Sequence, residues 1–321
     1  MFPELSSSFS AGITIRKNNR NNNIKNADMG HRYLFITLFL VVFFSEGVLH
    51  AAELTIGLIP EQNVFKQFKR YEPLGKYIEK RTGIKIRFSA LSRYGNIVES
   101  FSEEKMDGAF WGSFTGALAI TKLGIEPVAR PVNFTGASTY SGYIFVRKDS
   151  GITDVESMKD SVFAFVDKAT SAGYIFPVAY LKEHGVNDID GYFKEHYFTG
   201  SHDAAVYAVL NGEAHIGCAK NTVIDFLAKE DRRVKDDLVV LAKSPDFPSN
   251  TLGLRRDLPQ DVKKKLRQVL IDMNKDPEGR EVLRDFGAVR FIESTRADYD
   301  PVFKVSEKAG IDLRNYTYKN R

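Results

Sequence analysis

The stretch Phe163-Ala164-Phe165-Val166-Asp167-Lys168-Ala169-Thr170-Ser171-Ala172-Gly173-Tyr174 joins an apolar strand to the start of a helix. Phe163 to Val166 has the character of a buried strand, and the apolar run to Leu181 predicts the helix. The small hydroxyl residues between them fall where the first helical N–H groups lack partners within the helix. N–H groups and hydroxyls that converge at such a point can hold a phosphate-like anion without a formal positive charge. A second junction, Gly200-Ser201-His202-Asp203-Ala204-Ala205-Val206, repeats this design and adds an imidazole.

Strands and helices alternate on both sides of these junctions. The pattern predicts strands at 54–58, 84–88, 108–111, 126–132, 140–147, 161–165, 197–198, 214–219, 238–242 and 252–255. It predicts helices at 73–81, 94–103, 113–123, 173–183, 202–211, 221–229, 259–274, 277–286 and 298–309. This order favours an α/β fold with largely parallel sheets covered by helices. Two successive α/β sets, joined by extended segments near 140–150 and 243–252, predict two lobes, two crossings and a ligand site between the lobes.

The first 52 residues differ in character from the rest of the chain. Residues 1–28 are polar and are typical of a disordered leader or of a misassigned start upstream of Met29. Residues 29–52 are typical of a secretory signal peptide, in which His31-Arg32 precedes an apolar core from Tyr33 to Phe44. That core is shorter than a membrane-spanning helix requires, and an uncleaved anchor is the alternative. We therefore expect an exported protein.

The remaining chain is large enough for two hydrophobic cores. The whole chain has 321 residues, of which 43% are hydrophobic, and we expect lobe 1 at 53–142 and 250–321 and lobe 2 at 143–249. Without residues 1–52 it keeps 40 basic and 38 acidic residues, a balance that does not argue for nucleic acid as a partner. The single Cys218 cannot form an internal disulfide and is typical of a core strand residue. We expect a monomer without cofactor or metal.

Four junctions combine a strand end, hydroxyl residues and a helix start. They are Ser92-Arg93-Tyr94-Gly95, Trp111-Gly112-Ser113-Phe114-Thr115, Ala169-Thr170-Ser171 and Ser201-His202-Asp203. Each by itself is typical of an ordinary helix cap, because Ser, Thr and Asp are preferred at that position. Four together, two in each predicted lobe, favour an anion site made mostly of neutral donors.

His202 has several interpretations that the residues alone leave open. It can act as a general base, donate a hydrogen bond to a bound oxyanion, or serve as a cap or a surface histidine. Tyr140 and Tyr143 lie near the predicted crossing and are more typical of core or cleft wall than of ligand contacts.

The order of several motifs resembles a known family. These motifs are Leu54-Thr55-Ile56-Gly57-Leu58-Ile59-Pro60-Glu61, Tyr71-Glu72-Pro73-Leu74-Gly75-Lys76-Tyr77-Ile78, Ser92-Arg93-Tyr94, Thr170-Ser171-Ala172-Gly173-Tyr174, Gly200-Ser201-His202-Asp203-Ala204-Ala205 and Ser244-Pro245-Asp246-Phe247-Pro248. Over about residues 53–315 the chain is similar to the phosphate, phosphite and phosphonate substrate-binding proteins of ABC importers. The resemblance implies a two-lobed periplasmic-binding fold of type II, a small phosphorus oxyanion as ligand and an ABC permease in the inner membrane as partner.

The resemblance also implies ligand contacts. Tyr94 would contact the ligand from the first lobe, and Trp111 stands where an aromatic residue often lines the pocket. Thr170, Ser171 and His202 would hold the phosphonate oxygens from the second lobe.

Three positions depart from the family pattern. Ala169 replaces a common Ser, which removes one donor. Val223 stands where binders of aminoalkylphosphonates have an acidic residue, and Asn250 stands where those binders can have an Asp. With both carboxylates absent, we expect a ligand without an amine, or a different oxyanion.

The first hypothesis is therefore a periplasmic solute-binding protein that delivers a phosphonate, phosphite or phosphate-like anion to an ABC permease. The alternative is a periplasmic ligand-sensing module for a membrane signalling partner. A third hypothesis is a hydrolase that uses His202 with Ser171. Because the sequence contains no nucleophile elbow and no set of metal ligands, this hypothesis is the weakest, and we expect no enzymatic activity.

Overall fold

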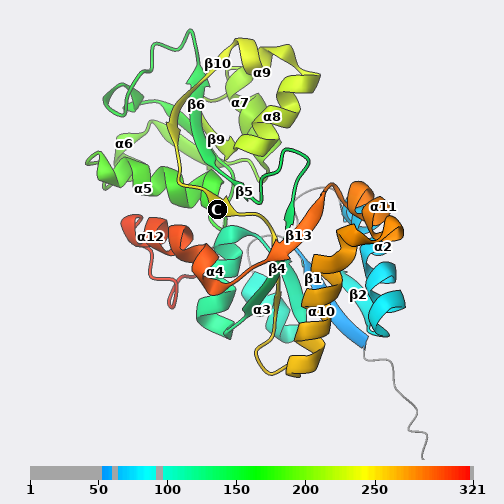
Figure 1. Cartoon of the computed structure of the whole chain (residues 1–321). Helices are drawn as coiled ribbons and strands as arrows, with labels where there is room; N and C mark the ends of the chain where they lie inside the picture. The colour runs from blue at the N-terminus through cyan, green and yellow to red at the C-terminus, as the bar shows by residue number, and fades with distance from the viewer. Residues whose placement is uncertain (1–52, 60–63, 92–96, 319–321) are drawn as a thin grey trace, which may run out of the picture. The chain divides into compact units, whose positions relative to one another are not determined.

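The computed structural model describes residues 53–59, 64–91 and 97–318 (Figure 1). These residues belong to one compact unit that spans Ala51–Arg321. The expected leader and signal peptide lie outside the described residues, and their assignment stays a prediction. Across the described ranges, every helix falls short of the length and apolar character that a membrane crossing requires.

The first sheet has six strands in the order β13-β4-β12-β3-β1-β2. They are β1 (Glu53–Leu58), β2 (Lys85–Ala90), β3 (Gly108–Trp111), β4 (Glu126–Val132), β12 (Thr251–Leu254) and β13 (Arg290–Glu293). β1 pairs in parallel with β2 and β3, whereas β12 runs antiparallel to both β3 and β4. The carboxyl ends of β1 to β4 therefore share one edge of this sheet, and β12 begins at that edge.

The second sheet has five strands in the order β10-β6-β9-β7-β8. They are β6 (Gly142–Arg147), β7 (Val162–Phe165), β8 (Glu195–Phe198), β9 (Ile216–Lys220) and β10 (Leu238–Lys243). β7 is parallel to β8 and β9, and β6 is antiparallel to β9. The carboxyl ends of β7, β8 and β9 thus meet at one edge, where β6 begins.

The chain crosses between the sheets twice. It leaves the first sheet through β5 (Thr139–Tyr140) and returns through β11 (Phe247–Pro248), and these two short strands pair with each other. The predicted strand 140–147 is consequently divided at Ser141, because its two parts belong to different sheets. The Ser141 N–H donates instead to the Asn221 side chain, at 2.9 Å. Two α/β sets with two crossings agree with the predicted fold class.

Helices cover both sheets (Figure 1). They are α2 (Val64–Thr82), α3 (Ile97–Glu103), α4 (Ser113–Leu123), α5 (Phe176–Glu183), α6 (Ile189–Tyr192), α7 (His202–Leu210), α8 (Asn221–Glu230), α9 (Arg232–Asp236), α10 (Gln260–Asp272), α11 (Pro277–Phe286) and α12 (Asp300–Lys308). Short helical turns complete the elements: η2 (Glu156–Met158), the π-helical η3 (Ser171–Ile175), η4 (Met273–Lys275) and η5 (Arg296–Tyr299).

Helix α2 corrects the predicted start of the helix at Pro73. It begins nine residues earlier, at Val64, and carries Pro73 in its interior. A proline inside a helix costs about 3 kcal/mol, and burial of the neighbouring Tyr71 offsets this cost. The Tyr71 ring packs edge-on against Phe110 at 4.9 Å and Phe286 at 5.0 Å. Tertiary packing thus decides where this helix begins.

One apolar cluster joins elements that follow different sheets. Phe114 and Leu118 of α4 pack in it with Ile175 of η3, Ala179 of α5 and Val302 of α12. Helix α12 contacts both α5 and α4. The C-terminal part of the chain therefore lies against both lobes.

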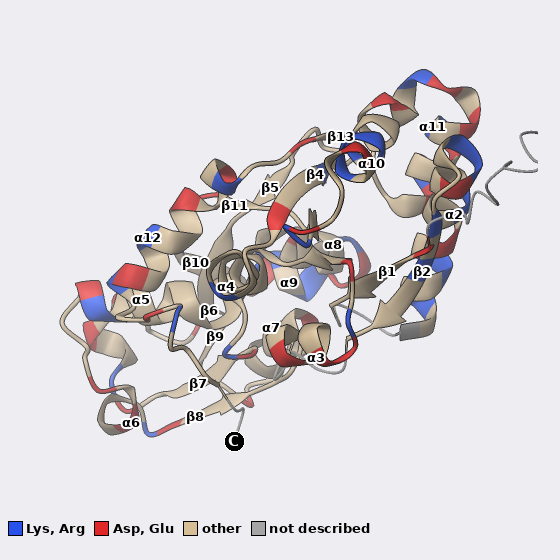
Figure 2. Ribbon diagram, turned by 90° about the horizontal axis from the view of Figure 1, so that it is seen from below, with Lys and Arg blue, Asp and Glu red and all other residues tan. Residues whose placement is uncertain are grey.

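Charged side chains of both signs are interspersed on the outer helices. Figure 2 shows Lys and Arg beside Asp and Glu on α2, α10, α11 and α12. Several of these residues form ion pairs, such as Lys80 with Glu278 at 2.8 Å and Lys308 with Glu183 at 2.5 Å. Mixed signs of this kind are typical of a solvated surface.

Candidate functional site

The starts of α4 and η3 meet. Ser113 Oγ lies 2.8 Å from Ser171 Oγ, and Ser113 also hydrogen-bonds the hydroxyl of Tyr140. All three residues are buried. Because α4 follows β3 of the first sheet and η3 follows β7 of the second, hydroxyls from both lobes converge at one point.

Helix capping does not consume these hydroxyls. The N-cap of α4 is Gly112, which has no side chain to cap the helix, and the N-cap of η3 is Thr170, whose side chain makes no capping bond. By contrast, Ser201 is an ordinary cap of α7, since its Oγ accepts the Ala204 N–H at 3.4 Å. Of the predicted junction residues, Ser201 is therefore an ordinary helix cap, whereas the side chains of Ser113 and Thr170 do not cap a helix.

Asp167 organises the turn that leads into η3. Its main-chain oxygen accepts the Thr170 N–H at 3.0 Å and the Thr170 hydroxyl at 2.6 Å. Its carboxylate accepts the Ala169 N–H at 2.8 Å. Ala169 itself is buried in the apolar cluster with Phe165 and Ala172. Hydrogen bonds between Asp167 and residues of the same turn thus order it, and Thr170 and Ser171 lie at its end.

His202 is held as a neutral donor. Its Nδ1 accepts the main-chain N–H of Lys220 at 3.4 Å, so the proton of the neutral ring is assigned to Nε2. Burial, with the nearby positive charge of Lys220, holds the pKa of this imidazole well below its ordinary value. A ring with a depressed pKa and a proton on Nε2 is a poor general base, which disfavours the hydrolase hypothesis. Nε2 is buried and finds no hydrogen-bond partner among the described residues.

A cavity of about 210 Å³ is lined by residues from both lobes. It is lined by Arg70, Pro131, Asn133, Tyr140, Lys220, Thr222, Ser249, Asn250 and Gly287. The Lys220 ammonium lies 4.7 Å from the centre of the Tyr140 ring. The Asn250 amide nitrogen is buried and has no partner in the part of the chain that the structure describes. The described residues of its lining include two cations and no carboxylate, so this part of the cavity is suited to an anion.

Tyr140 connects the cavity with the hydroxyl cluster, because it lines the cavity and bonds Ser113. The Tyr140 hydroxyl bonds Ser113, which in turn bonds Ser171. The Lys220 ammonium lies over the Tyr140 ring, and the Lys220 main-chain N–H donates to His202. The structure therefore brings Ser171, His202 and Asn250 to one region, with Thr170 beside Ser171.

The structure does not bring Trp111 to this cavity. The side chain is 1% exposed and packs with Phe101, with ring centres 5.1 Å apart. Successive strand residues point to opposite faces, so Trp111 shares the face of Ala109 and lies in the apolar cluster with Met106 and Ile125. The expectation that Trp111 lines the pocket is thus corrected: it is a core residue. Tyr94 lies outside the described residues.

Val223 also faces a hydrophobic core. It packs against the cluster that contains Val206 and Val209, whereas its neighbour Thr222 lines the cavity. No acidic side chain stands at either position.

Sequence reasoning missed Lys220 and underrated Tyr140. Lys220 ends a buried strand and directly precedes a helix, which is the signal that selected the four junctions. Tyr140 lines the cavity, which agrees with the prediction that it belongs to the core or the cleft wall. Its contacts with Ser113 and Lys220 could not be predicted, because they depend on how the chain crosses between the sheets.

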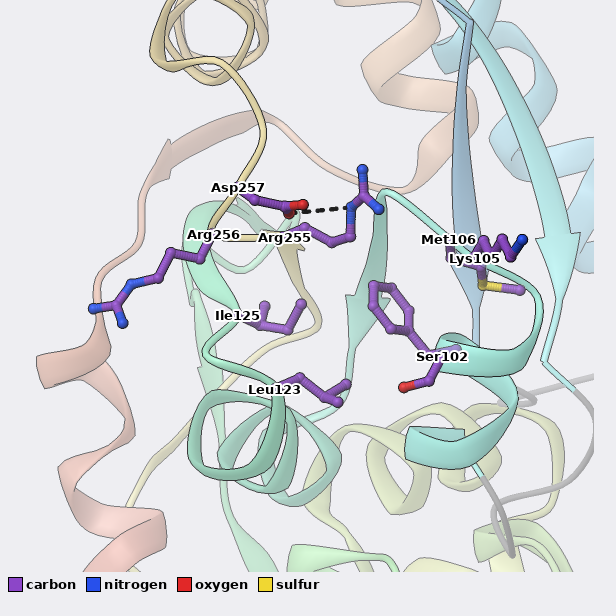
Figure 3. Close-up of a pocket in the computed structure, with 9 residues that line it drawn as sticks. Ser102, Lys105, Met106, Leu123, Ile125, Arg255, Arg256 and Asp257 are labelled. Carbon is purple, nitrogen blue, oxygen red and sulfur yellow. Dashed lines mark ion pairs between the residues drawn. The ribbon is translucent and has the colours of Figure 1, made fainter.

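A second cavity, of about 450 Å³, lies at the opposite edge of the first sheet (Figure 3). Phe101, Met106, Leu123 and Ile125 form its apolar part, and the carboxyl ends of α3 and α4 lie beside it. Helix carboxyl ends disfavour anions. Its Arg255 is already paired with Asp107 at 3.1 Å and with Asp257 at 3.4 Å. Lys105 and Arg256 also line this cavity, but the helix carboxyl ends and the Asp257 carboxylate make it less suited to an oxyanion than the first cavity.

Two α/β lobes, two crossings and donors converging from both lobes define a solute-binding protein of the two-lobed type II class. The model of one family, described as "ABC transporter, phosphonate, periplasmic substrate-binding protein", matches residues 56–299. The chain belongs to this family. The predicted family and the predicted class, a periplasmic substrate-binding protein of an ABC importer, are confirmed.

Individual relatives agree with this assignment. The phosphate-import protein PhnD of Mycolicibacterium smegmatis is 28% identical over 276 residues, which cover 80% of this chain and 86% of that protein. The phosphonates-binding periplasmic protein of Escherichia coli is 23% identical over 261 residues, or 79% and 77% of the two chains. Among solved structures, PhnD1 of Prochlorococcus marinus in complex with methylphosphonate has a TM-score of 0.68 at 21% identity, covering 81% of this chain and 99% of that one. This last likeness confirms the fold.

Proposed function

We propose that this protein binds a small phosphorus oxyanion in the cleft between lobe 1 (53–142 and 250–321) and lobe 2 (143–249), and delivers it to an ABC permease in the inner membrane. The observation that carries the proposal is a pair of unsatisfied donors. The Nε2–H of His202 and the amide of Asn250 are buried without partners among the described residues. A buried donor without an acceptor costs about 1–3 kcal/mol. Two of them at one cleft favour an acceptor-rich ligand.

The proposed contacts come from both lobes. The Ser171 hydroxyl and the His202 Nε2–H would hold the oxyanion from the second lobe, and the Asn250 amide from the first. Thr170 would join them by turning its hydroxyl from the Asp167 main-chain oxygen to the ligand. Tyr140 and Lys220 join them, since both line the cavity. Tyr94 is retained as a proposed contact on the family resemblance alone.

The proposed ligand carries no amine. An ammonium group in the cavity would meet the Lys220 side chain and the neutral Thr222 and Asn250, with no carboxylate among the lining residues that the structure describes. Relatives of this chain are named for phosphate, phosphonates and phosphite, and a neighbour in fold is a complex with methylphosphonate. We therefore place phosphate, phosphite and methylphosphonate ahead of 2-aminoethylphosphonate.

A thermal-shift titration tests the proposal. The purified protein is mixed with phosphate, phosphite, methylphosphonate, 2-aminoethylphosphonate, sulfate or acetate. A ligand that binds the native state raises the melting temperature with its concentration. We expect a rise with at least one phosphorus oxyanion and none with acetate. No rise with any phosphorus compound would overturn the proposal, and a preference for 2-aminoethylphosphonate would overturn the ligand class.

The cellular setting follows from the family. We propose secretion to the periplasm through the signal peptide at 29–52, a monomeric state, and no enzymatic turnover of the ligand. Fractionation of cells, size-exclusion chromatography and recovery of unaltered ligand from the protein test these three statements in turn.

A further inference from the structure

The C-terminal segment passes beside both helix starts that face the cleft. Tyr316, sixteen residues after the start of α12, makes three contacts there. Its hydroxyl donates to the main-chain oxygen of Lys168 at 2.9 Å. Its own main-chain oxygen accepts from the Lys122 ammonium of α4 at 2.6 Å. Its ring lies edge-on to Phe114, with ring centres 5.3 Å apart. One residue therefore touches elements of both lobes.

The contact with Lys168 falls on the turn that ends at the proposed site. Lys168 lies between Asp167, which orders the turn from within, and Ala169-Thr170-Ser171. Tyr316 adds a hydrogen bond from a residue 148 positions away in the sequence. A carbonyl held from outside limits rotation of the adjoining peptide groups, so the positions of Thr170 and Ser171 depend on this bond.

The contact with Phe114 falls on the other helix start. Phe114 directly follows Ser113, whose hydroxyl lies 2.8 Å from that of Ser171. Phe114 and Tyr316 pack in the same apolar cluster as Ile175 and Val302. Tyr316 thus supports both sides of the Ser113–Ser171 contact without being part of it.

The phenol is suited to a lasting structural bond. Burial raises the pKa of Tyr316 above its ordinary value, so the hydroxyl stays protonated and donates at neutral pH. The acceptor is a main-chain carbonyl, which does not titrate. The bond is therefore independent of pH near neutrality.

We propose that Tyr316 is a positioning residue for ligand binding: it holds the Asp167–Ser171 turn and the start of α4 in the geometry that receives the ligand, without contacting the ligand. This inference rests on the proposed function. Binding groups that are already placed do not lose conformational freedom when the ligand arrives, which strengthens binding. The C-terminal segment would in this way set the affinity of a cleft that it does not line.

The test compares two variants that each lose one tyrosine hydroxyl. In Y316F the bond to Lys168 is lost. In Y192F a chemically equal bond is lost, since the Tyr192 hydroxyl donates to the main-chain oxygen of Val155 at 2.6 Å. Tyr192 lies on α6 and is absent from the cavity lining. Y316F should bind methylphosphonate and phosphate about 2- to 12-fold more weakly, the range for one net hydrogen bond. Y192F should bind both as the wild type does.

Hydrogen exchange of the ligand-free proteins gives a readout independent of the ligand. The main-chain N–H groups of Ala169 and Thr170 are bonded within the turn. They should exchange faster in Y316F than in the wild type, and at the wild-type rate in Y192F. If the wild type bound no phosphorus oxyanion, the proposed function would fail and the inference with it, whereas exchange would still show whether Tyr316 orders the turn.

Three results would overturn the inference. The first is a Y316F protein with wild-type affinity and wild-type exchange of the turn. The second is faster exchange with unchanged affinity. The third is an equal loss of affinity in Y316F and Y192F, which would indicate a general effect of lost stability.

Discussion

Ser113 Oγ and Ser171 Oγ lie 2.8 Å apart although 58 positions separate them in the chain. One hydroxyl belongs to the helix that follows β3 and the other to the helical turn that follows β7. The bond therefore links the two lobes directly at the proposed binding site, and it is buried. It is a direct side-chain contact between the two helix starts.

Removal of either serine hydroxyl should weaken this link. S113A and S171A should each lower the affinity for the bound oxyanion, and a double-mutant cycle should give a coupling of about 0.5–1.5 kcal/mol, the net value of one hydrogen bond. Isothermal titration of the four proteins measures it. Additive effects would mean that the two hydroxyls act independently.

His202 should make stability depend on pH. Its pKa is lowered in the folded protein, whereas in the unfolded chain it has the ordinary value of about 6.5. As pH falls below about 6.5 the unfolded chain takes up a proton that the folded protein resists. Stability should therefore be full above that pH and decrease as pH falls towards the folded pKa.

H202Q tests this statement, because glutamine keeps an N–H donor and does not titrate. Urea unfolding at several pH values between about 5 and 7.5 should show a weaker loss of stability at low pH in H202Q than in the wild type. An identical pH dependence in both proteins would contradict the assignment.

A carboxylate at position 222 should create a partner for an amine. Thr222 lines the cavity, so T222E should improve binding of 2-aminoethylphosphonate relative to methylphosphonate by about 0.5–1 kcal/mol, the value of an exposed ion pair. V223E is the matched control, because Val223 packs against an apolar cluster. It should lower stability by about 1–3 kcal/mol, the cost of a poorly solvated polar group, without a gain in selectivity. Calorimetric titration and urea unfolding measure the two effects.

Lys220 should contribute to affinity through its charge. In K220M the cavity keeps an aliphatic side chain of similar length beside the Tyr140 ring and loses the ammonium. Affinity for the oxyanion should decrease, and its dependence on salt should become shallower, because salt screens charge pairs. Dissociation constants at low and high ionic strength test this. An equally steep salt dependence in K220M would place the responsible charge elsewhere.

Gly142 should tolerate no side chain. A Cβ at this position would lie 2.9 Å from Cα of Ala172. G142A should therefore force the start of β6 away from η3 and cost about 1–3 kcal/mol, as overpacked sites do. Urea unfolding gives the change directly, and a variant as stable as the wild type would show that the two segments separate without cost.

Local patterns were sufficient to locate most of the binding elements. The apolar run Phe163 to Val166 and the hydroxyls after it predicted a strand-to-helix junction, and the structure has β7 followed by η3 there. A strand-to-helix junction depends mainly on residues that are neighbours in the chain, so the sequence alone can predict it. Helix α2 and strand β13 were not predicted correctly, because their extents depend on partners distant in the chain.

The sequence by itself determined the strand and helix order, the family and the junctions that carry hydroxyls and His202. Tertiary structure alone decided which of these groups meet. The crossing at Tyr140 places that ring beside Ser113 and Lys220. Trp111 packs in an apolar cluster, although Ser113, two residues later, bonds Tyr140. The physical reason is that a site between two lobes consists of contacts between residues far apart in the sequence. Those contacts form only when burial of the hydrophobic cores fixes the positions of the two sheets.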